Sequence, residues 1–236
     1  MKVLGIIPAR GGSKGIPRKN IRTFAGKPLL AWTAEAALAS MLDRVILSSE
    51  DEEIVSLGRI LGLDVPFTRP AELAGDTAAS IDVVLHAVKT LEEKEGYRPD
   101  AIMLLQPTSP LRRTKHIDES IDLLSRDAKA NSLVSVVKAP HNMIPESLMR
   151  FNDRGYIEPL LSWDSSIHQR QNKPVYYARN GAAIYLVRTD TLYKTRTLYG
   201  EKIIAYEMSK EDSVDIDDSF DWNIAEFLMA NRIKIK

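Results

Sequence analysis

Short apolar runs alternate with amphipathic stretches along the chain, in the order that is typical of β-α-β units. Several runs, such as Ala-Ile-Met-Leu-Leu at 101–105, are apolar at every position, as expected when helices cover both faces of a sheet. The predicted strands are Val3–Pro8, Arg44–Ser48, Ala101–Leu105, Ser132–Val137 and Ala182–Val187, with shorter candidates at Val65–Thr68 and Ile203–Tyr206. The pattern therefore predicts a mostly parallel sheet with right-handed crossovers.

The amphipathic stretches predict helices between these strands. They cover Pro28–Ser40, Asp51–Leu61, Ala78–Glu95, Lys115–Ser125 and Ser219–Asn231. Pro28 suits the first turn of its helix, and the side chains of Asp51 and Ser219 can cap free backbone N–H groups of theirs. Helices on both sheet faces make the expected fold α/β, a three-layer sandwich with a mostly parallel central sheet.

A polar segment at 139–178 breaks the alternation. It contains four prolines and scattered aromatic residues, and it shows no clear helical or strand period. Such a segment is too long for an irregular loop without a function in a compact domain. The chain of 236 residues has the size of one domain. We therefore expect one domain over 1–236, in which 139–178 is a small inserted subdomain that serves as a substrate lid or a dimerisation arm.

The composition excludes several classes of protein. Lysine plus arginine equals aspartate plus glutamate at 32 residues each, which argues against a general nucleic-acid or membrane-surface binder. Cysteine is absent, which excludes disulfides, a thiol nucleophile and a cysteine-bound metal. No apolar run approaches the ~20 residues of a membrane span, and the N-terminal run ends at Pro8, as a strand rather than a signal peptide would. The expected location is the cytoplasm.

Positive charge is concentrated near the N-terminus and negative charge near the C-terminus. The first 34 residues hold seven cations and no acid, whereas residues 207–226 hold eight acids and one lysine. The stretch RGGSKGIPRKN at 10–20 follows the first predicted strand, at the sheet edge where α/β folds bind ligands. Its glycines allow backbone N–H groups to face a phosphate, and its cations can neutralise one. Because it matches neither GxxxxGK[ST] nor GxGxxG, we predict a basic loop for a polyanion such as a triphosphate, rather than a solvated surface loop.

The acidic stretch SVDIDDSFDW at 213–222 contains two carboxylates in alternation. Asp215 and Asp217 flank Ile216, so that in an extended segment both point to one side. Two carboxylates without a neighbouring histidine or cysteine predict a site for a hard cation such as Mg²⁺. The alternative, acids at a helix N-terminus, fits Asp218 and Asp221 better.

A third motif, LLQPTSPLRR at 104–113, ends a buried strand in Gln106. An amide at the carboxyl end of a strand can recognise a base or a sugar through paired donor and acceptor groups. The alternative is a stiff turn whose prolines merely end the strand.

These motifs, in this order, resemble those of the CMP-sialic acid synthetases, the N-acylneuraminate cytidylyltransferases that activate nonulosonic acids. The resemblance rests on IPARGGSKGIPRKN, LLQPTSPLR, the RQ…P…Y…NGA stretch and DID near the end, and it covers nearly the whole chain. It implies a nucleotide-diphospho-sugar transferase (GT-A-like) fold and a homodimer in which an arm reaches the partner's site. It also implies transfer of CMP from CTP to the anomeric hydroxyl of a nonulosonic acid, with release of pyrophosphate, Mg²⁺ as cofactor (Mn²⁺ as a substitute), and a role in cell-surface polysaccharide or lipopolysaccharide synthesis.

The resemblance also assigns roles to residues of this sequence. It places CTP against Ala9, Arg10, Gly12, Ser13, Lys14, Lys19, Asn20, Arg69 and Ser80. It places the sugar against Gln106, Arg170, Tyr177, Arg179 and Asn180. It makes Asp215 and Asp217 the metal ligands. The catalytic residues that it implies are Arg10, Lys14, Lys19 and Asp217.

Several points stay open at the level of sequence. HNMIPES stands where sialate enzymes often carry a lysine, and Arg179 precedes the asparagine of YYARNG. Both departures affect the sugar pocket, so the substrate is N-acylneuraminate or a legionaminate or KDO-type acid. Its carboxylate is clamped by Arg170 or Arg179, and we expect His141 or His168 to touch the sugar. The general base is Asp217 or a metal-bound hydroxide, and the metal count is one or two.

Two other functions fit the sequence less well. A sugar-nucleotide-dependent glycosyltransferase of the same fold should carry its DxD motif after a mid-chain strand, whereas the DxD here begins at Asp215. A non-catalytic nucleotide sensor would have little reason to keep both the basic loop and the Asp215–Asp217 pair. The KDO-type synthetases rank below the sialate group because their opening loop lacks the GGSKG form.

Overall fold

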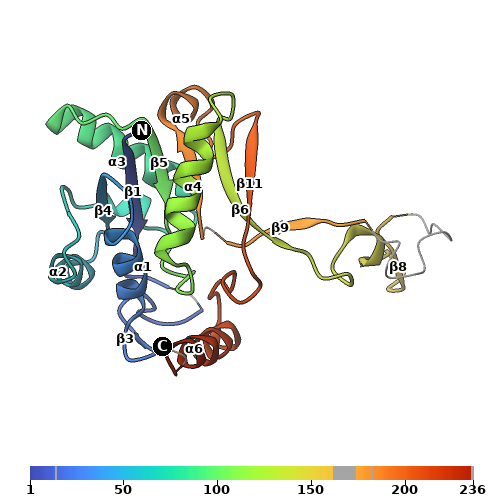
Figure 1. Cartoon of the computed structure of the whole chain (residues 1–236). Helices are drawn as coiled ribbons and strands as arrows, with labels where there is room; N and C mark the ends of the chain where they lie inside the picture. Colours follow the sequence, from blue (N-terminus) through green and yellow to red (C-terminus); the bar gives the residue numbers. More distant parts are fainter. Residues whose placement is uncertain (14, 162–173, 182, 235–236) are drawn as a thin grey trace.

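A computed structural model of the chain describes residues 1–13, 15–161, 174–181 and 183–234 (Figure 1). Within these residues, a seven-stranded sheet has the order β11-β6-β10-β5-β1-β4, with β9 paired to β6. Its strands are β1 Val3–Pro8, β4 Arg44–Ser48, β5 Ala101–Leu104, β6 Ser132–Lys138, β9 Tyr177–Arg179, β10 Tyr185–Arg188 and β11 Ile203–Glu207. β1 is parallel to β4 and β5, and β11 is parallel to β6, whereas β10 runs antiparallel to both of its neighbours. The predicted mostly parallel sheet is confirmed.

Alternation along β1 separates the two faces of the sheet. Val3 and Ile7 pack in one apolar cluster, and Leu4 and Ile6 pack in another. The first cluster includes residues of α1 Leu29–Leu38, α2 Glu52–Ile60 and α4 Thr114–Arg126. The second includes residues of α3 Ser80–Glu95 and α5 Thr189–Thr195. The helices therefore form the two outer layers of a three-layer sandwich, as predicted (Figure 1).

The structure corrects several predicted elements. Val65–Thr68 is not a strand, because only an isolated bridge joins Ile46 to Asp64 and Pro66 has no N–H with which to extend a ladder.

Asp51 caps α2 as predicted, through bonds from the N–H groups of Glu53 (3.1 Å) and Ile54 (3.0 Å).

The predicted cap Ser219 is wrong, because Asp218 accepts the first free N–H groups of α6 (Ser219–Lys234). Several other elements were not predicted, among them the short helix α5, which lacks an apolar period, and the hairpin of β2 Thr23–Phe24 and β3 Lys27–Pro28.

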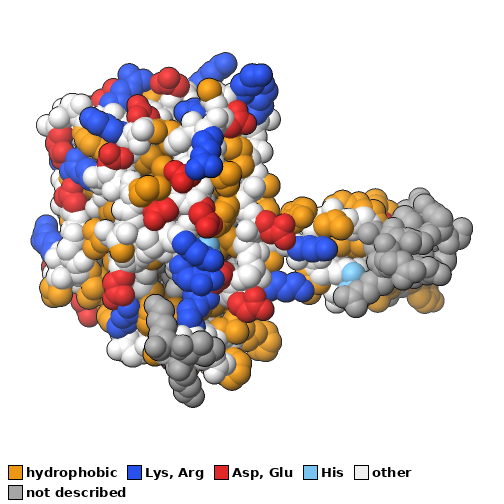
Figure 2. Space-filling view, in the orientation of Figure 1, with side chains coloured by type: hydrophobic (Ala, Val, Ile, Leu, Met, Phe, Trp, Pro, Cys, Tyr) orange, Lys and Arg blue, Asp and Glu red, His pale blue; other side chains and the backbone are white. Residues whose placement is uncertain are grey.

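Part of the segment 139–178 projects from the body of the molecule (Figure 1). After η2 Pro145–Ser147, it forms an antiparallel hairpin of β7 Met149–Phe151 and β8 Ile157–Pro159. Apolar side chains lie exposed on it, and Phe151 and Tyr156 keep 75% and 70% of their surface accessible (Figure 2). An exposed apolar surface of this kind is typical of a surface that contacts another molecule. The function of the segment stays a prediction.

A third apolar cluster joins the two ends of the chain. Ile16 of the basic loop, Ile216 of the acidic stretch and Trp222 of α6 belong to this cluster. It places the acidic stretch against the basic loop, beside the carboxyl edge of the sheet.

No helix among the described residues combines the length and apolarity needed to cross a membrane.

Candidate active site

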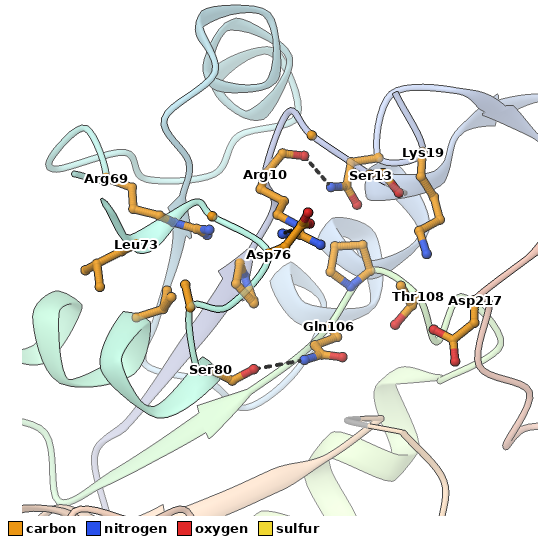
Figure 3. Close-up of a pocket in the computed structure, with 17 residues that line it drawn as sticks. Arg10, Ser13, Lys19, Arg69, Leu73, Asp76, Ser80, Gln106, Thr108 and Asp217 are labelled. Atoms are coloured by element: carbon orange, nitrogen blue, oxygen red, sulfur yellow. Dashed lines mark hydrogen bonds and ion pairs between the residues drawn. The ribbon is translucent and has the colours of Figure 1, made fainter. Parts of the chain in front are cut away.

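A cavity of about 270 Å³ opens at the carboxyl edge of β1 and β5 (Figure 3). Most of the residues predicted to bind the nucleotide line it. The predicted residues in its wall are Arg10, Gly12, Ser13, Lys19, Asn20, Arg69, Ser80, Gln106 and Asp217. They come from the basic loop, the segment before α3, the turn after β5 and the acidic stretch. Motifs that lie about two hundred residues apart in the sequence thus meet at one cavity.

Internal bonds give the basic loop its shape. Asn20 Nδ2 donates to the carbonyl oxygen of Arg10 at 2.9 Å, which draws the two ends of the loop together. Arg18 faces away from the cavity, where it pairs with Asp51 and Glu53 at the start of α2. A Cβ at Gly15 would lie 2.1 Å from the Asp217 carbonyl oxygen, so only glycine permits this close approach.

Lys19 links the basic loop to the acidic stretch. Its Nζ donates to the carbonyl oxygen of Ile216 at 2.7 Å. Burial lowers the pKa of the Lys19 ammonium, and the carboxylates of Asp217 and Asp215 oppose that effect. The ammonium is therefore a partly desolvated cation beside two carboxylates, where its charge acts more strongly than it would in water.

Asp215 and Asp217 form the acidic side of the site. Asp217 is exposed at the cavity wall, whereas Asp215 lies deeper and accepts a hydrogen bond from Ser109 Oγ at 3.3 Å. Burial and the charge of Asp217 raise the pKa of Asp215, and the neighbouring hydroxyls of Thr108 and Ser109 offset only part of this rise. A Cβ at Gly181, whose φ is +66°, would lie 2.4 Å from an Asp215 carboxylate oxygen, so the NGA motif makes room for this side chain.

The two carboxylates fit a Mg²⁺ ion. An ion beside Asp215 would stabilise a carboxylate whose ionised form is otherwise disfavoured by burial. Among the described residues, no group of three or more histidine, cysteine, aspartate or glutamate side chains could hold a metal. A Mg²⁺ ion at the pair would therefore take its remaining ligands from substrate phosphates and water, as Mg²⁺ commonly does in proteins.

The opposite wall of the cavity carries Arg69, Ser80 and Gln106. Arg69 is buried, and its guanidinium donates to Ser48 Oγ at 3.0 Å and to the Ser48 carbonyl oxygen. Burial lowers the pKa of Arg69 to about 10, so it stays charged at neutral pH. Gln106 Nε2 donates to Ser80 Oγ at 3.4 Å, a long bond that leaves the amide free to turn toward a ligand.

Other predicted residues lie away from this cavity. Ala9 is buried in the core, and its N–H donates to the Ser48 carbonyl oxygen at 3.0 Å. Asn180 is also buried, where it accepts from Ser135 Oγ at 2.7 Å and donates to Ser213 Oγ at 2.9 Å. Three others are exposed at the surface of the protein: Tyr177, Arg179 and His141. Outside the described residues lie Lys14, His168 and Arg170.

Arg112 is a buried residue that our sequence reasoning did not assign. It donates to the carbonyl oxygens of Ala183 (2.7 Å) and Gln106 (3.2 Å) and to Thr33 Oγ1 (2.7 Å). Burial lowers the pKa of Arg112 to about 9. Its position in LLQPTSPLRR was visible, but the sequence does not show that this arginine points inward and holds the turn that carries Gln106.

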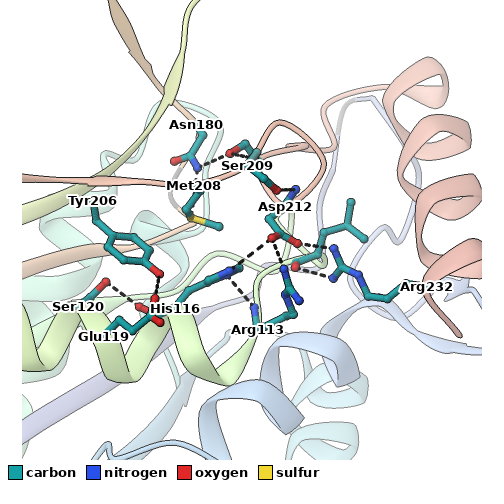
Figure 4. A network of polar contacts seen from close by, with 12 residues as sticks. Arg113, His116, Glu119, Ser120, Asn180, Tyr206, Met208, Ser209, Asp212 and Arg232 are labelled. Carbon is teal, nitrogen blue, oxygen red and sulfur yellow. Dashed lines mark hydrogen bonds and ion pairs between the residues drawn. The ribbon is translucent and has the colours of Figure 1, made fainter. Parts of the chain in front are cut away.

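A polar network anchors the start of the acidic stretch (Figure 4). Asp212 is 3% exposed and binds the guanidinium groups of both Arg113 and Arg232. His116 Nδ1 accepts the N–H of Arg113 at 3.2 Å, so the proton of the neutral ring is on Nε2, which faces Asp212 at 3.4 Å. The network ties the loop before Asp215 to both α4 and α6.

We expect Asp212→Asn to lower the free energy of unfolding by about 2–3 kcal/mol at pH 7, because two arginines lose their shared carboxylate. Burial alone would raise the pKa of Asp212, but hydrogen bonds from His116 and Arg113 and the charge of Arg232 hold it well below its ordinary value. The difference from wild type should therefore be full above about pH 4 and shrink as the pH falls further. Urea unfolding at several pH values measures it.

Glu211→Gln, at an exposed neighbouring acid, is the control and should change the stability by less than about 0.5 kcal/mol. Equal unfolding midpoints for Asp212→Asn and wild type at pH 7 would contradict the role given to this network.

Comparison with known proteins identifies the family. A family model described as Cytidylyltransferase matches residues 4–225. The N-acylneuraminate cytidylyltransferase of Escherichia coli O18:K1:H7 is 37% identical over 237 residues, which cover 99% of this chain and 54% of that protein. The CMP-N,N'-diacetyllegionaminic acid synthase of Legionella pneumophila is 32% identical over 232 residues, 97% of each chain. This chain thus spans about half the length of the first relative and nearly all of the second.

The fold is also found among solved structures. A CMP:2-keto-3-deoxy-manno-octonic acid synthetase, solved in complex with CTP, superimposes with a TM-score of 0.73 at 19% identity. The likeness covers 98% of this chain and 100% of that one, and at this identity it shows a shared fold. With a family model over nearly its whole length and full-length similarity above 30% identity, the chain belongs to the cytidylyltransferase family, in the group of the CMP-sialic acid synthetases that its motifs predicted.

Proposed function

We propose that this protein transfers CMP from CTP to the anomeric hydroxyl of a nonulosonic acid, with release of pyrophosphate. The observation that carries the proposal is the cavity in which the basic loop, Arg69, Gln106 and Asp217 meet. Cations there suit a triphosphate, and the amide and hydroxyl groups of the opposite wall suit a base and a sugar. The names of the relatives support the same reaction.

The reaction requires positioning more than covalent chemistry. The sugar hydroxyl attacks the α-phosphorus of CTP, a new phosphorus–oxygen bond forms, and the bond to the bridging oxygen breaks as pyrophosphate leaves with its electron pair. Arg10 and Lys19 would hold the phosphates and offset the charge that develops on the leaving group. The exposed carboxylate of Asp217 lies at the cavity wall, where it can accept the proton of the attacking hydroxyl.

Asp215 and Asp217 would hold Mg²⁺, with Mn²⁺ as a possible substitute. The ion, when bound, supplies positive charge to the α-phosphate and the leaving pyrophosphate. Asp215 contributes a carboxylate fixed by Ser109, and Lys19 keeps the paired acids from repelling the nucleotide when no ion is present.

The sugar and the assembly belong to the same proposal. N-acylneuraminate is our first choice of acceptor, supported by the Escherichia coli relative. The alternatives are a legionaminate-type acid, which the Legionella relative supports, and a KDO-type acid. We further propose a homodimer built through the projecting segment, whose exposed apolar side chains include Phe151 and Tyr156. A cytoplasmic location and a role in cell-surface polysaccharide synthesis stay predictions.

A pyrophosphate-release assay tests the function directly. The purified chain is incubated with CTP, Mg²⁺ and a panel of N-acetylneuraminate, a legionaminate and KDO, each also without CTP. We expect release with at least one acid, and the acid with the highest kcat/KM identifies the substrate. Absence of release with every acid, in a protein that melts cooperatively, would refute the proposal.

A further inference from the structure

A second carboxylate, besides that of Asp217, lies in the wall of the cavity that carries Arg10, Lys19 and Arg69. Asp76 Oδ1 lies 2.9 Å from Arg10 NH1, and both residues line the cavity wall (Figure 3). Asp76 belongs to the loop between η1 (Ala71–Leu73) and α3. Unlike Asp217, Asp76 is not part of the proposed metal pair, and its negative charge repels each phosphate that enters.

We propose that Asp76 is a competing anion of the nucleotide site: its carboxylate holds Arg10 in the empty site, yields it to a phosphate of the nucleotide, and recovers it as product leaves. This inference rests on the proposed function, since it takes the ligand of Arg10 to be a nucleotide phosphate. Asp76 thereby limits how tightly phosphate groups are held and speeds the release of product.

The geometry suits such an exchange. The Arg10 and Asp76 side chains keep 35% and 45% of their surface exposed, and an ion pair of that exposure shifts an equilibrium constant only a few-fold. A phosphate offers Arg10 a stronger, bidentate partner, so it can displace the carboxylate. The exchange nevertheless weakens binding, because the ligand must break the ion pair and then tolerate a nearby negative charge.

The competition acts on phosphate groups and not on the base. CTP can compensate through contacts of its nucleoside with the Arg69 and Ser80 wall, whereas bare polyphosphates have no such contacts. Asp76 therefore keeps inorganic polyphosphates, including the pyrophosphate product, from occupying the site for long.

Binding of four ligands to Asp76→Asn tests the inference by calorimetry. CTP should bind about five-fold to ten-fold more tightly than to wild type, and the gain should shrink at high salt, because partly exposed charges are screened. Cytidine should bind unchanged. Pyrophosphate should also bind more tightly to Asp76→Asn, and the gain for CMP shows whether the α-phosphate feels the same carboxylate. In turnover, Asp76→Asn should show stronger inhibition by added product.

Three controls make the result specific. Glu72→Gln removes the same charge from the same segment, at an exposed acid of η1, and should alter CTP affinity less than two-fold. In an Arg10→Gln background, Asp76→Asn should lose the part of its effect that comes from releasing Arg10, which a double-mutant cycle measures. Asp76→Ala should reproduce the asparagine variant, and melting temperatures confirm that all variants fold.

The outcomes separate the two proposals. Wild type that fails to bind CTP refutes the proposed function. Wild type that binds CTP, with Asp76→Asn equal to it or weaker, overturns only the competing-anion inference, as does an equal gain in Glu72→Gln.

Discussion

Replacing Asp217 with asparagine is expected to lower kcat by about 10³-fold or more, with the fold intact. The carboxylate is exposed at the cavity wall and pairs with Asp215 to form the proposed Mg²⁺ site, so its loss removes both a metal ligand and a proton acceptor. The backbone should not change, because its contacts near this point involve the Asp217 N–H and carbonyl oxygen rather than the side chain. Steady-state pyrophosphate release across a Mg²⁺ titration measures the effect.

Asp218→Ser is the matched control for this variant. It removes the same charge one residue away, yet the serine hydroxyl can replace the carboxylate oxygen that caps α6. We expect its kcat to stay within about three-fold of wild type. If Asp217→Asn kept more than a tenth of the wild-type kcat at saturating Mg²⁺, the metal site would have to lie elsewhere.

The fold could be predicted closely where the chain carries continuous apolar runs. β1 and β4 have the predicted bounds, because a strand buried on both faces appears in the sequence as a continuous apolar run with clear ends. The prediction failed at Val65–Thr68, where Phe67 is buried without forming a ladder and Pro66 lacks a donor. The α5 helix was missed because seven residues rich in threonine show no apolar period.

The candidate site was predictable wherever glycines and charges combine in one motif. The basic loop, Arg69, Gln106 and Asp217 meet in one cavity, and the ligands assigned to them stay predictions. Individual polar side chains were harder to assign, because the sequence shows a residue type but not the direction of its side chain. Asn180 is buried among serines.

Neighbouring cations of the basic loop also differ in the residues that they contact. Arg18 pairs with acids of α2, although by sequence alone it is indistinguishable from Lys19 one residue later. The sequence likewise did not predict a role for Asp76. A single acid in a loop carries no motif, and its ion pair with Arg10 is visible only once the two segments are folded together.

Lys19→Met is expected to lower kcat by about 10²- to 10³-fold while leaving the KM for the sugar acid within about three-fold of wild type. The Lys19 ammonium is held by the Ile216 carbonyl oxygen at 2.7 Å, beside the basic loop and the two carboxylates. From there it can stabilise negative charge that grows on pyrophosphate only as the reaction proceeds, so its loss should affect the transition state more than the bound substrates. Initial rates over a matrix of CTP and sugar concentrations separate the two parameters.

Lys19→Arg distinguishes charge from shape at this position. The guanidinium keeps the positive charge, but it is larger and cannot place a single point charge in a half-buried site fitted to an ammonium. We therefore expect a kcat between those of wild type and Lys19→Met. A methionine variant that raised the KM for CTP and left kcat unchanged would mean that Lys19 binds the ground state of the nucleotide, and the charge on the departing pyrophosphate would then have to be met by Arg10 or by the metal ion alone.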